Sequence, residues 1–301
     1  MLDEYGRRVD YAKISLTDKC NLKCVYCMPD GVYENNLIND TLSFNDYKFI
    51  INGLSQVGIR KIRFTGGEPL LYPHLIELIK YTSFECNIND IAITTNGIGL
   101  DEMAYELKQS GLKTVNISLD SLKSYRYKSI TRGSNLADVL KSINECLSLG
   151  LKVKINCVVI NGFNDDEIYD FINMTNYYHI DVRFIELMPI GEGKYFYEDG
   201  YFNITNYINK IDKLSKIEDD IDSTAKLYKL DYAKGRVGVI APLSSQFCNR
   251  CNKIKVTSDG KIKSCISSNE EIDIRYYLNK PMMFKEELKE AIYKKPQKHN
   301  L

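Results

Sequence analysis

The stretch Lys13-Ile-Ser-Leu-Thr-Asp-Lys-Cys-Asn-Leu-Lys-Cys-Val-Tyr-Cys27 joins an alternating polar and apolar segment to three closely spaced cysteines. Alternation with a period of two predicts a β-strand with one polar and one apolar face. Cys20, Cys24 and Cys27 then supply three thiolates in a Cys-x₃-Cys-x₂-Cys loop. A [4Fe–4S] cluster has four iron corners, which are normally held by one cysteine each. The loop therefore predicts a cluster with one iron left open for a small molecule.

Strand-like segments of this kind recur along the chain, with helix-like segments between them. The expected strands are Lys13–Thr17, Lys61–Thr65, Ile91–Thr95, Thr114–Leu119, Val153–Ile160 and Val182–Met188. Between the first two strands, Ser43 is a candidate N-cap for a helix with apolar residues at helical spacing, and Gly58 is its expected end. Six β-then-α units predict an α/β fold with a parallel sheet, either open or curved into a partial barrel.

The two faces of the expected strands differ in polarity. The polar face carries Lys13, Ser15, Thr17, Lys61, Arg63, Thr65, Thr94, Asn96, Asn116, Ser118, Lys154 and Asn156. Because both faces of a parallel sheet are normally covered, we expect helices on the apolar face and an interior cavity on the polar one. Buried cations are costly unless they are paired, so this cavity is expected to hold an anionic ligand. An open sheet with one solvated face is the alternative.

The strand–helix alternation stops after about residue 195. Residues 196–235 are expected to form a connector or irregular extension. Strands are then expected at Val237–Ile240, Lys253–Thr257 and Lys261–Ile266. Asp259-Gly260, between the last two, is typical of a two-residue hairpin turn.

A second set of three cysteines flanks this hairpin. Cys248-Asn-Arg-Cys251 precedes it and Cys265 follows it, so the turn would bring three thiolates to one metal centre. The competing interpretation is a Cys₄ zinc site that pairs the Cys-x₂-Cys of each set. Such a site would leave Cys20 and Cys265 without a role, so zinc is the poorer fit.

Composition and charge exclude several classes of protein. Lys and Arg together number 40, as do Asp and Glu, so the chain has no net charge with which to bind nucleic acid nonspecifically. No apolar run reaches membrane-spanning length, and no signal peptide is visible behind the charged N-terminus. Nine cysteines in such a chain indicate metal or redox chemistry in the reducing cytoplasm. Cys146 and Cys157 fall on apolar faces and are expected in the core.

Polar residues follow several of the expected strands at their carboxyl ends. Thr65-Gly-Gly-Glu-Pro69 follows the second strand, where two glycines would let a ligand touch the backbone and Glu68 would accept from an amine. Thr94-Thr-Asn-Gly97 and Asn116-Ile-Ser-Leu-Asp120 end two further strands in the same way. Because ligand sites of parallel α/β folds lie at the carboxyl ends of strands, the three segments predict one site at a shared rim.

Taken together, these motifs resemble those of the radical S-adenosylmethionine (SAM) superfamily, and within it the MoaA family of GTP 3′,8-cyclases. The resemblance rests on Tyr5-Gly-Arg, Thr17-Asp-Lys-Cys20, Tyr26-Cys-Met-Pro29, Arg63-Phe-Thr-Gly-Gly-Glu-Pro-Leu70, Arg183-Phe-Ile-Glu-Leu-Met188 and the Cys-x₂-Cys-x₁₃-Cys set. It implies a radical SAM core, a partial (β/α)₆ TIM-like barrel, in residues 1–230. A C-terminal domain with the second cluster is implied for residues 231–301.

The resemblance also implies the chemistry. The first cluster would chelate SAM, whose reductive cleavage yields a 5′-deoxyadenosyl radical, and the enzyme would be a lyase that converts GTP to 3′,8-cyclo-7,8-dihydro-GTP in molybdenum cofactor biosynthesis. Two [4Fe–4S] clusters are implied, held by the two cysteine sets. The implied SAM contacts are Tyr26, Gly67, Ser118 and Met188. The implied substrate contacts are Lys13, Arg63, Thr94, Lys154, Lys253 and Lys255, whereas Arg183 fits either the pocket or a helix-facing salt bridge.

The family further implies particular partners and a cytoplasmic location. An external one-electron donor would reduce the enzyme, and the downstream cyclic pyranopterin monophosphate synthase would receive the product. A homodimer is one assembly that the sequence leaves open. Two other readings also stay open: a radical SAM enzyme with an auxiliary cluster that acts on a different substrate such as a peptide, and a non-catalytic zinc-stabilised binding protein.

Two features depart from the family pattern. Lys13, Lys253 and Lys255 stand where the family usually shows arginines around the triphosphate, so we expect GTP to bind with looser phosphate geometry. The family generally ends in a Gly-Gly tail that reaches the active site, whereas this sequence ends in Lys295-Pro-Gln-Lys-His-Asn-Leu301. Either the sequence is a truncated one, or the role of the tail is dispensable or supplied otherwise.

Overall fold

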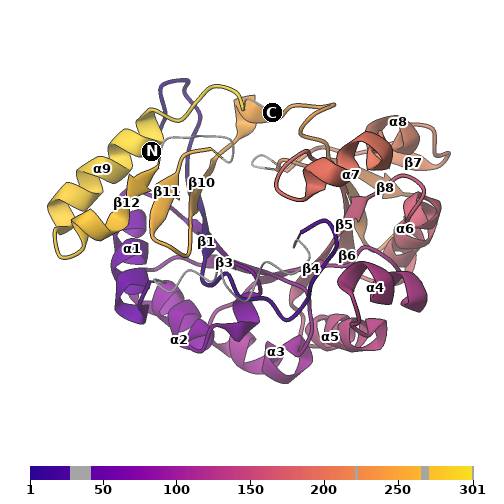
Figure 1. The fold of residues 1–301 in the computed structure, drawn as a ribbon, viewed down its shortest axis with the longest axis horizontal. Helices are drawn as coiled ribbons and strands as arrows, with labels where there is room; N and C mark the ends of the chain where they lie inside the picture. The colour runs from indigo at the N-terminus through magenta and orange to yellow at the C-terminus, as the bar shows by residue number, and fades with distance from the viewer. Residues whose placement is uncertain (28–41, 221–222, 266–270, 300–301) are drawn as a thin grey trace.

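The strands among the described residues form one twelve-stranded sheet in the order β12-β11-β10-β1-β2-β3-β4-β5-β6-β9-β8-β7. The computed structural model describes residues 1–27, 42–220, 223–265 and 271–299 (Figure 1). The strands are β1 Tyr11–Ser15, β2 Lys61–Thr65, β3 Asp90–Thr95, β4 Thr114–Ser118, β5 Lys152–Val159, β6 Ile180–Glu186, β7 Leu214–Lys216, β8 Lys226–Leu230, β9 Arg236–Ile240, β10 Lys253–Val256, β11 Lys261–Lys263 and β12 Ile272–Asp273.

Most of the helices follow strands in alternation. The α-helices are α1 Phe44–Gln56, α2 Leu75–Lys80, α3 Leu100–Gln109, α4 Ser124–Thr131, α5 Leu136–Ser148, α6 Ile168–Tyr177, α7 Gly193–Gly200, α8 Ile204–Ile208 and α9 Pro281–Tyr293. Shorter helical turns lie at Pro69–Leu71, Tyr81–Glu85, Asp165–Glu167, Cys248–Arg250 and Ile274–Tyr277. Along the described residues, no helix is long and apolar enough to cross a membrane.

The middle of the sheet is parallel and curved. Strands β1 to β6 run parallel in sequence order, and β10 and β9 add one further parallel strand at either side. Figure 1 shows this sheet bent around a central axis, with α1 to α6 on its outer side. The arrangement confirms the predicted partial TIM-like barrel, and β10 to β12 form its C-terminal extension.

The outer face of the sheet packs under the helices as the alternation predicts. Ile14, Ile62, Phe64 and Val115 are fully buried there. The Ser43 hydroxyl accepts from Asp46 N–H at 3.2 Å and forms the predicted cap of α1. Gly58 follows this helix with a φ of +91°, as expected for a residue that ends a helix. Cys146 and Cys157 are core residues, also as predicted.

The segment expected to be irregular contains two further strands. β7 and β8 form an antiparallel ribbon on β9, within residues 196–235. Both strands are short, and β8 (Lys226-Leu-Tyr-Lys-Leu230) does not alternate polar and apolar residues, so their pairing depends on the neighbouring edge of the sheet. The predicted domain boundary at residues 230 and 231 falls in the turn between β8 and β9, and it stays a prediction.

The hairpin between β10 and β11 differs from its prediction by one residue. Thr257 N–H donates to Lys261 O at 2.9 Å, and Val256 lies opposite Ile262. The connection is therefore the three residues from Ser258 to Gly260, with Gly260 at a φ of +83°. β11 ends at Lys263, so the predicted extension of this strand is wrong for Ser264 and Cys265, and Ile266 lies outside the described residues.

Gly66 and Gly67 bring the end of β2 against the backbone that leads into the first cysteine loop. Gly67 N–H donates to Thr17 O at 2.6 Å, and Glu68 N–H donates to Lys19 O at 2.8 Å. A Cβ on Gly67 would lie 2.3 Å from Lys19 O, which is closer than real Cβ atoms approach. The glycines are thus required by a contact within the chain, which the sequence analysis did not foresee.

We predict that Gly67→Ala lowers the free energy of unfolding by about 2–3 kcal/mol, because the new Cβ meets backbone that has no free rotation. Urea denaturation measures the loss. Gly99→Ala is the control, since a Cβ there has nothing within 4 Å and meets only the strain of a φ of +77°. This control should lose about 1 kcal/mol, and equal losses in the two variants would contradict the prediction.

Candidate active site

A chamber of about 720 Å³ lies inside the curve of the sheet. Seven residues of the predicted polar face line it: Lys13, Lys61, Arg63, Thr65, Thr94, Lys154 and Asn156. Arg183 lines it too, which places this side chain in the pocket and not on the helix side. The interior cavity predicted from strand parity is therefore confirmed.

The lining of the chamber is strongly cationic. Ten Lys and Arg side chains line it, against the three carboxylates of Asp10, Asp90 and Asp220. All three carboxylates already have partners: Asp90 pairs with Lys61 at 2.7 Å, Asp10 with Arg8 at 3.3 Å and Asp220 with Arg236 at 3.1 Å. Most of the positive charge thus faces the cavity without a carboxylate of its own.

Strand register concentrates part of this charge in one row. Lys263, Lys255, Lys13 and Arg63 lie directly opposite one another across β11, β10, β1 and β2. Like charges at directly opposite positions destabilise a sheet. Lys263 pairs with Glu271, and the other three cations of the row favour a ligand of opposite charge against them.

Burial and mutual repulsion shift the pKa values of these lysines. Burial, reinforced by Arg63 and Lys253, lowers the pKa of Lys13 to about 7. Burial, followed by Arg183, lowers the pKa of Lys154 to about 7. Burial lowers the pKa of Lys253 to about 8, with Arg63 acting in the same direction. The charged forms of these three lysines are therefore destabilised when the chamber holds no anion.

Several buried donors of the chamber have no hydrogen-bond partner among the described residues. They are Arg63 Nε, Arg183 Nε, Lys253 Nζ and the Tyr11 hydroxyl. Buried polar groups are normally satisfied, and unpaired ones mark places where a ligand or water belongs. Orphaned donors in a cationic cavity fit an anion that accepts many hydrogen bonds, such as a phosphate chain.

Tyr11 is a lining residue that the sequence analysis missed. Three cations lie over its ring, with Lys61 Nζ, Arg63 Cζ and Lys253 Nζ at 5.3, 5.5 and 5.4 Å from the centroid. An aromatic face attracts cations, so the ring helps to hold these side chains in place. The alternation of side chains along the strand could have identified Tyr11, because it precedes Lys13 by two residues and shares its face. The strand was expected to begin only at Lys13.

The second cysteine set lies at the amino-end side of the parallel strands. Cys248, Cys251 and Cys265 all line the chamber. Lys253, two residues after Cys251, lies opposite Tyr11 at the start of β1. Although burial raises the pKa of Cys251, the nearby Lys295 and Lys253 lower it overall, which favours the thiolate that binds iron.

The first cysteine loop lies at the opposite, carboxyl ends of the strands. Cys20 follows the end of β1, and Asn96, at the end of β3, donates to Asn21 Oδ1 at 2.7 Å. The Tyr26 hydroxyl donates to Asp120 Oδ2 at 2.6 Å, which ties the loop to the end of β4. The two sets are separated by the length of β1 and its flanking residues, roughly 20 Å at the rise of an extended chain.

The donor sets fit iron–sulfur clusters. Burial raises the pKa of Cys24 to about 12, and the charges of Cys27 and Cys20 add to the effect, which indicates that the three thiols are neighbours. Within the described residues, no three His, Cys, Asp or Glu side chains converge tightly enough to chelate a single metal ion. A cubane cluster does not need its thiolates to meet at one point, because each thiolate bonds a different iron corner.

The residues expected to contact SAM gather around the first loop, with one exception. Gly67 follows β2, and Ser118 is the last residue of β4, both at the carboxyl ends of strands. Met188, two residues after β6, lines the chamber itself. Tyr26, Gly67 and Ser118 are not among the chamber's lining residues.

Glu68 accepts hydrogen bonds within the protein, and its predicted role as an acceptor for an amine stays a prediction. Its side chain is buried, and its carboxylate accepts from Thr95 Oγ1 and Asn96 N–H, both at 2.7 Å. Leu70 N–H donates to the same carboxylate at 3.1 Å. Glu68 therefore links the ends of β2 and β3.

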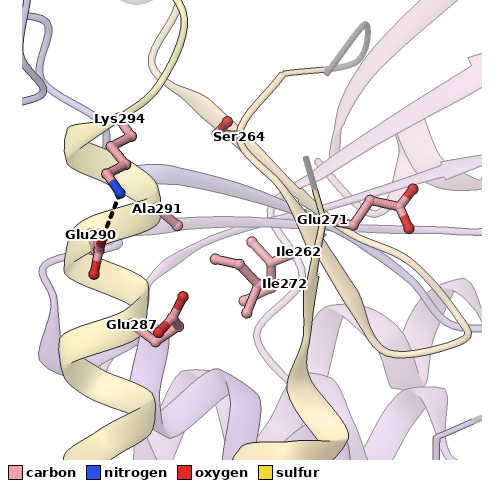
Figure 2. A pocket seen from close by; sticks show the side chains of 8 residues that line it. All are labelled: Ile262, Ser264, Glu271, Ile272, Glu287, Glu290, Ala291 and Lys294. Atoms are coloured by element: carbon pink, nitrogen blue, oxygen red, sulfur yellow. Dashed lines mark hydrogen bonds and ion pairs between the residues drawn. The ribbon is translucent and has the colours of Figure 1, made fainter. Parts of the chain in front are cut away.

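A second, smaller hollow of about 130 Å³ lies outside the barrel, between α9 and β11 and β12. Figure 2 shows Glu287 and Glu290 on the helix, on the side of Ile262 and Ile272, whereas the Glu271 side chain points away from the helix. Its carboxylates disfavour an anion, so the candidate site is the large chamber.

Comparison with known proteins adds two family matches that divide the chain. Residues 14–175 match the radical SAM superfamily. Residues 180–301 match a family described as Molybdenum Cofactor Synthesis C. Together the two matches contain both cysteine sets.

Curated relatives match the chain over its full length. A protein of Clostridium botulinum strain Langeland named GTP 3′,8-cyclase is 47% identical over 303 residues, which is 100% of this chain and 95% of the relative. A Clostridium acetobutylicum protein of the same name is 48% identical over 305 residues, with the same two coverages. Among solved structures, SuiB of Streptococcus suis bound to S-adenosylmethionine superposes with a TM-score of 0.65 at 17% identity, over 96% of this chain and 67% of SuiB. The last likeness shows a shared fold.

We predict that Lys154→Met stabilises the ligand-free protein by about 1–3 kcal/mol at pH 6, because it removes an unpaired buried cation. The folded-state pKa of about 7 lies below the usual 10.5, so the unfolded chain binds more protons between these values. Wild-type stability should therefore rise as the pH increases through this window, and the advantage of the variant should shrink.

Denaturant titrations at a series of pH values measure both effects. Lys152→Met is the matched control, since Lys152 is an exposed residue of the same strand. A stabilisation by Lys154→Met that is equal at pH 6 and pH 10 would contradict the prediction.

Proposed function

The chain belongs to the GTP 3′,8-cyclase family of the radical SAM superfamily, and on this premise we propose that its chamber holds GTP between two iron–sulfur centres at opposite ends of the barrel. The enzyme is accordingly a radical SAM lyase that converts GTP to 3′,8-cyclo-7,8-dihydro-GTP in molybdenum cofactor biosynthesis. Family membership over the whole chain favours this function over a peptide substrate and over a zinc-stabilised binding protein.

The cationic chamber is the observation that carries the substrate assignment. Lys13, Arg63, Thr94, Lys154, Lys253 and Lys255 all line it. A triphosphate accepts hydrogen bonds from every side and neutralises the row of like charges across β11, β10, β1 and β2. The nucleoside would then lie further along the chamber, toward the cysteines of one end.

We assign the first cluster to Cys20, Cys24 and Cys27, and SAM to the strand ends beside them. The radical SAM match implies one [4Fe–4S] cluster and SAM as cofactors. When bound, the cluster supplies the electron that splits SAM. Tyr26, Gly67, Ser118 and Met188 are the proposed SAM contacts. The hydrogen bond from Tyr26 to Asp120 ties the cysteine loop to the end of β4.

A second cluster is proposed for Cys248, Cys251 and Cys265. Three thiolates beside a cationic chamber would again leave one iron without a protein ligand. That iron would face the substrate space, because all three cysteines line the chamber. We propose that it binds the guanine end of the nucleotide, while the lysines and arginines hold the phosphates.

Further partners follow from the reaction. SAM cleavage consumes an electron, so an external one-electron donor is proposed. We also propose product transfer to the cyclic pyranopterin monophosphate synthase and a cytoplasmic location, where cluster cysteines stay reduced. The proposed site is built from residues of one chain, so it does not require a homodimer.

The decisive experiment is an anaerobic turnover assay. Reduced protein incubated with SAM and GTP should yield 5′-deoxyadenosine and a cyclised nucleotide, detected by chromatography and mass spectrometry. Cys27→Ala should abolish both products, whereas Cys86→Ala should retain them, because Cys86 belongs to neither set. Zinc without iron in the purified protein, or 5′-deoxyadenosine without a cyclised nucleotide, would overturn the proposal.

We predict that GTP binds on the order of 100-fold more tightly than guanosine, since two or more charge-assisted hydrogen bonds distinguish them. Lys13→Arg should tighten GTP binding further and leave guanosine unchanged, because arginine adds a planar, bidentate contact. Calorimetric titration of the two ligands measures both ratios. Equal affinities for GTP and guanosine would contradict the assignment of the cations to the triphosphate.

A further inference from the structure

The segment from Lys295 to His299, which we call the strap, lies across the second cysteine set. It follows α9 and lies beside residues far away in the sequence. His299 Nε2 lies 3.2 Å from Pro242 O, in the loop after β9. Both Lys295 and His299 line the chamber.

Arg7 fastens the strap to the first of the three cysteines. Its guanidinium donates to Lys295 O at 3.0 Å, Pro296 O at 2.8 Å and Gln297 O at 3.2 Å. It also donates to Cys248 O at 2.9 Å. Asp3 accepts from Arg7 Nε at 2.5 Å and orients the group, which is buried. One side chain thus joins three successive carbonyls of the strap to the Cys248 backbone.

Lys295 makes the corresponding link to the other two cysteines. Its side chain is only 2% exposed, and Nζ donates to Lys253 O at 2.8 Å and to Ser264 O. Lys253 follows Cys251 by two residues, and Ser264 immediately precedes Cys265. The β10 and β11 pairing reaches only as far as Lys255 and Lys263. The Lys295 ammonium therefore bridges the start of β10 and the residue after β11, beyond the last backbone pairing between these two strands.

The charge of Lys295 also calls for an explanation. Both of its acceptors are neutral carbonyls, and a buried ammonium is costly unless negative charge lies nearby. The candidate negative charge is the group of three thiolates, whose own repulsion would otherwise drive them apart. A cluster bound by them would carry net negative charge beside the ammonium, and such charge influences its reduction potential.

We propose that Arg7 and Lys295 form a clamp that positions Cys248, Cys251 and Cys265 for the second cluster and places a positive charge beside it. The proposal rests on the second cluster proposed above. Neither residue ligates iron or belongs to the cysteine motif, so both are positioning residues. The clamp acts on the second cluster alone, since the first loop lies at the other end of the barrel.

The test compares Lys295→Met with Lys294→Met. Lys294 is the neighbouring residue, and Figure 2 shows its side chain turned to Glu290 along the surface of α9. Each protein is reconstituted anaerobically, and iron, sulfide and the electron paramagnetic resonance spectrum are measured. Wild type and Lys294→Met should hold about eight iron atoms per chain, and Lys295→Met about four, with the signal of the first cluster retained.

A third variant separates lost charge from misfolding. Lys295→Arg keeps the positive charge and the donors, so it should hold close to eight iron atoms. If Lys295→Met retains both clusters, the clamp predicts a more negative reduction potential for the second cluster only. Eight iron atoms together with unchanged potentials in Lys295→Met would overturn the clamp.

Two other results remain distinguishable from this one. Wild-type protein that holds only about four iron atoms would contradict the second cluster itself, and with it the proposed function of that site. Lys295→Met with unchanged clusters but weakened GTP binding would make Lys295 a phosphate ligand and would overturn the clamp alone.

Discussion

The row of cations across β11, β10, β1 and β2 is the constraint around which this barrel is organised. Lys263, Lys255, Lys13 and Arg63 lie opposite one another on adjacent strands, although like charges in this position weaken a sheet. The outer face offsets this cost, because its apolar side chains are fully buried under helices. Stability thus comes from one face of each strand, and the chemistry from the other.

This division explains which features the sequence predicted. Strand parity alone places Lys13, Arg63 and Lys154 in a cavity, because alternate residues of a strand must face opposite sides. The Ser43 cap and the position of Gly58 just after α1 follow from local chemistry in the same way. What local pattern could not give is contact between distant segments. The approach of Gly67 to Lys19 O, the link from Glu68 to Asn96 and the strap over Cys248 each depend on the finished fold.

The two cysteine sets lie in opposite electrostatic surroundings. After burial, the carboxylate of Asp120 is the next largest influence that raises the pKa of Cys24. At the other end, Lys295, Lys253 and Arg7 lower the pKa of Cys251. Positive charge favours the reduced form of a cluster, and neighbouring carboxylates disfavour it. One barrel therefore offers two similar ligand sets whose surroundings act on a bound cluster in opposite directions.

Lysine at the positions where the family resemblance implies arginine has a consequence for the chamber without a ligand. Arginine cannot lose its proton in a protein, so three arginines would keep their full charge in an empty chamber. The pKa values of Lys13 and Lys253, lowered to about 7 and about 8, allow these lysines to give up protons near neutral pH when no anion is bound. A triphosphate would favour the charged forms again, so that protons are taken up as it binds. The lysines thus give up bidentate phosphate geometry but reduce the electrostatic cost of holding the chamber open.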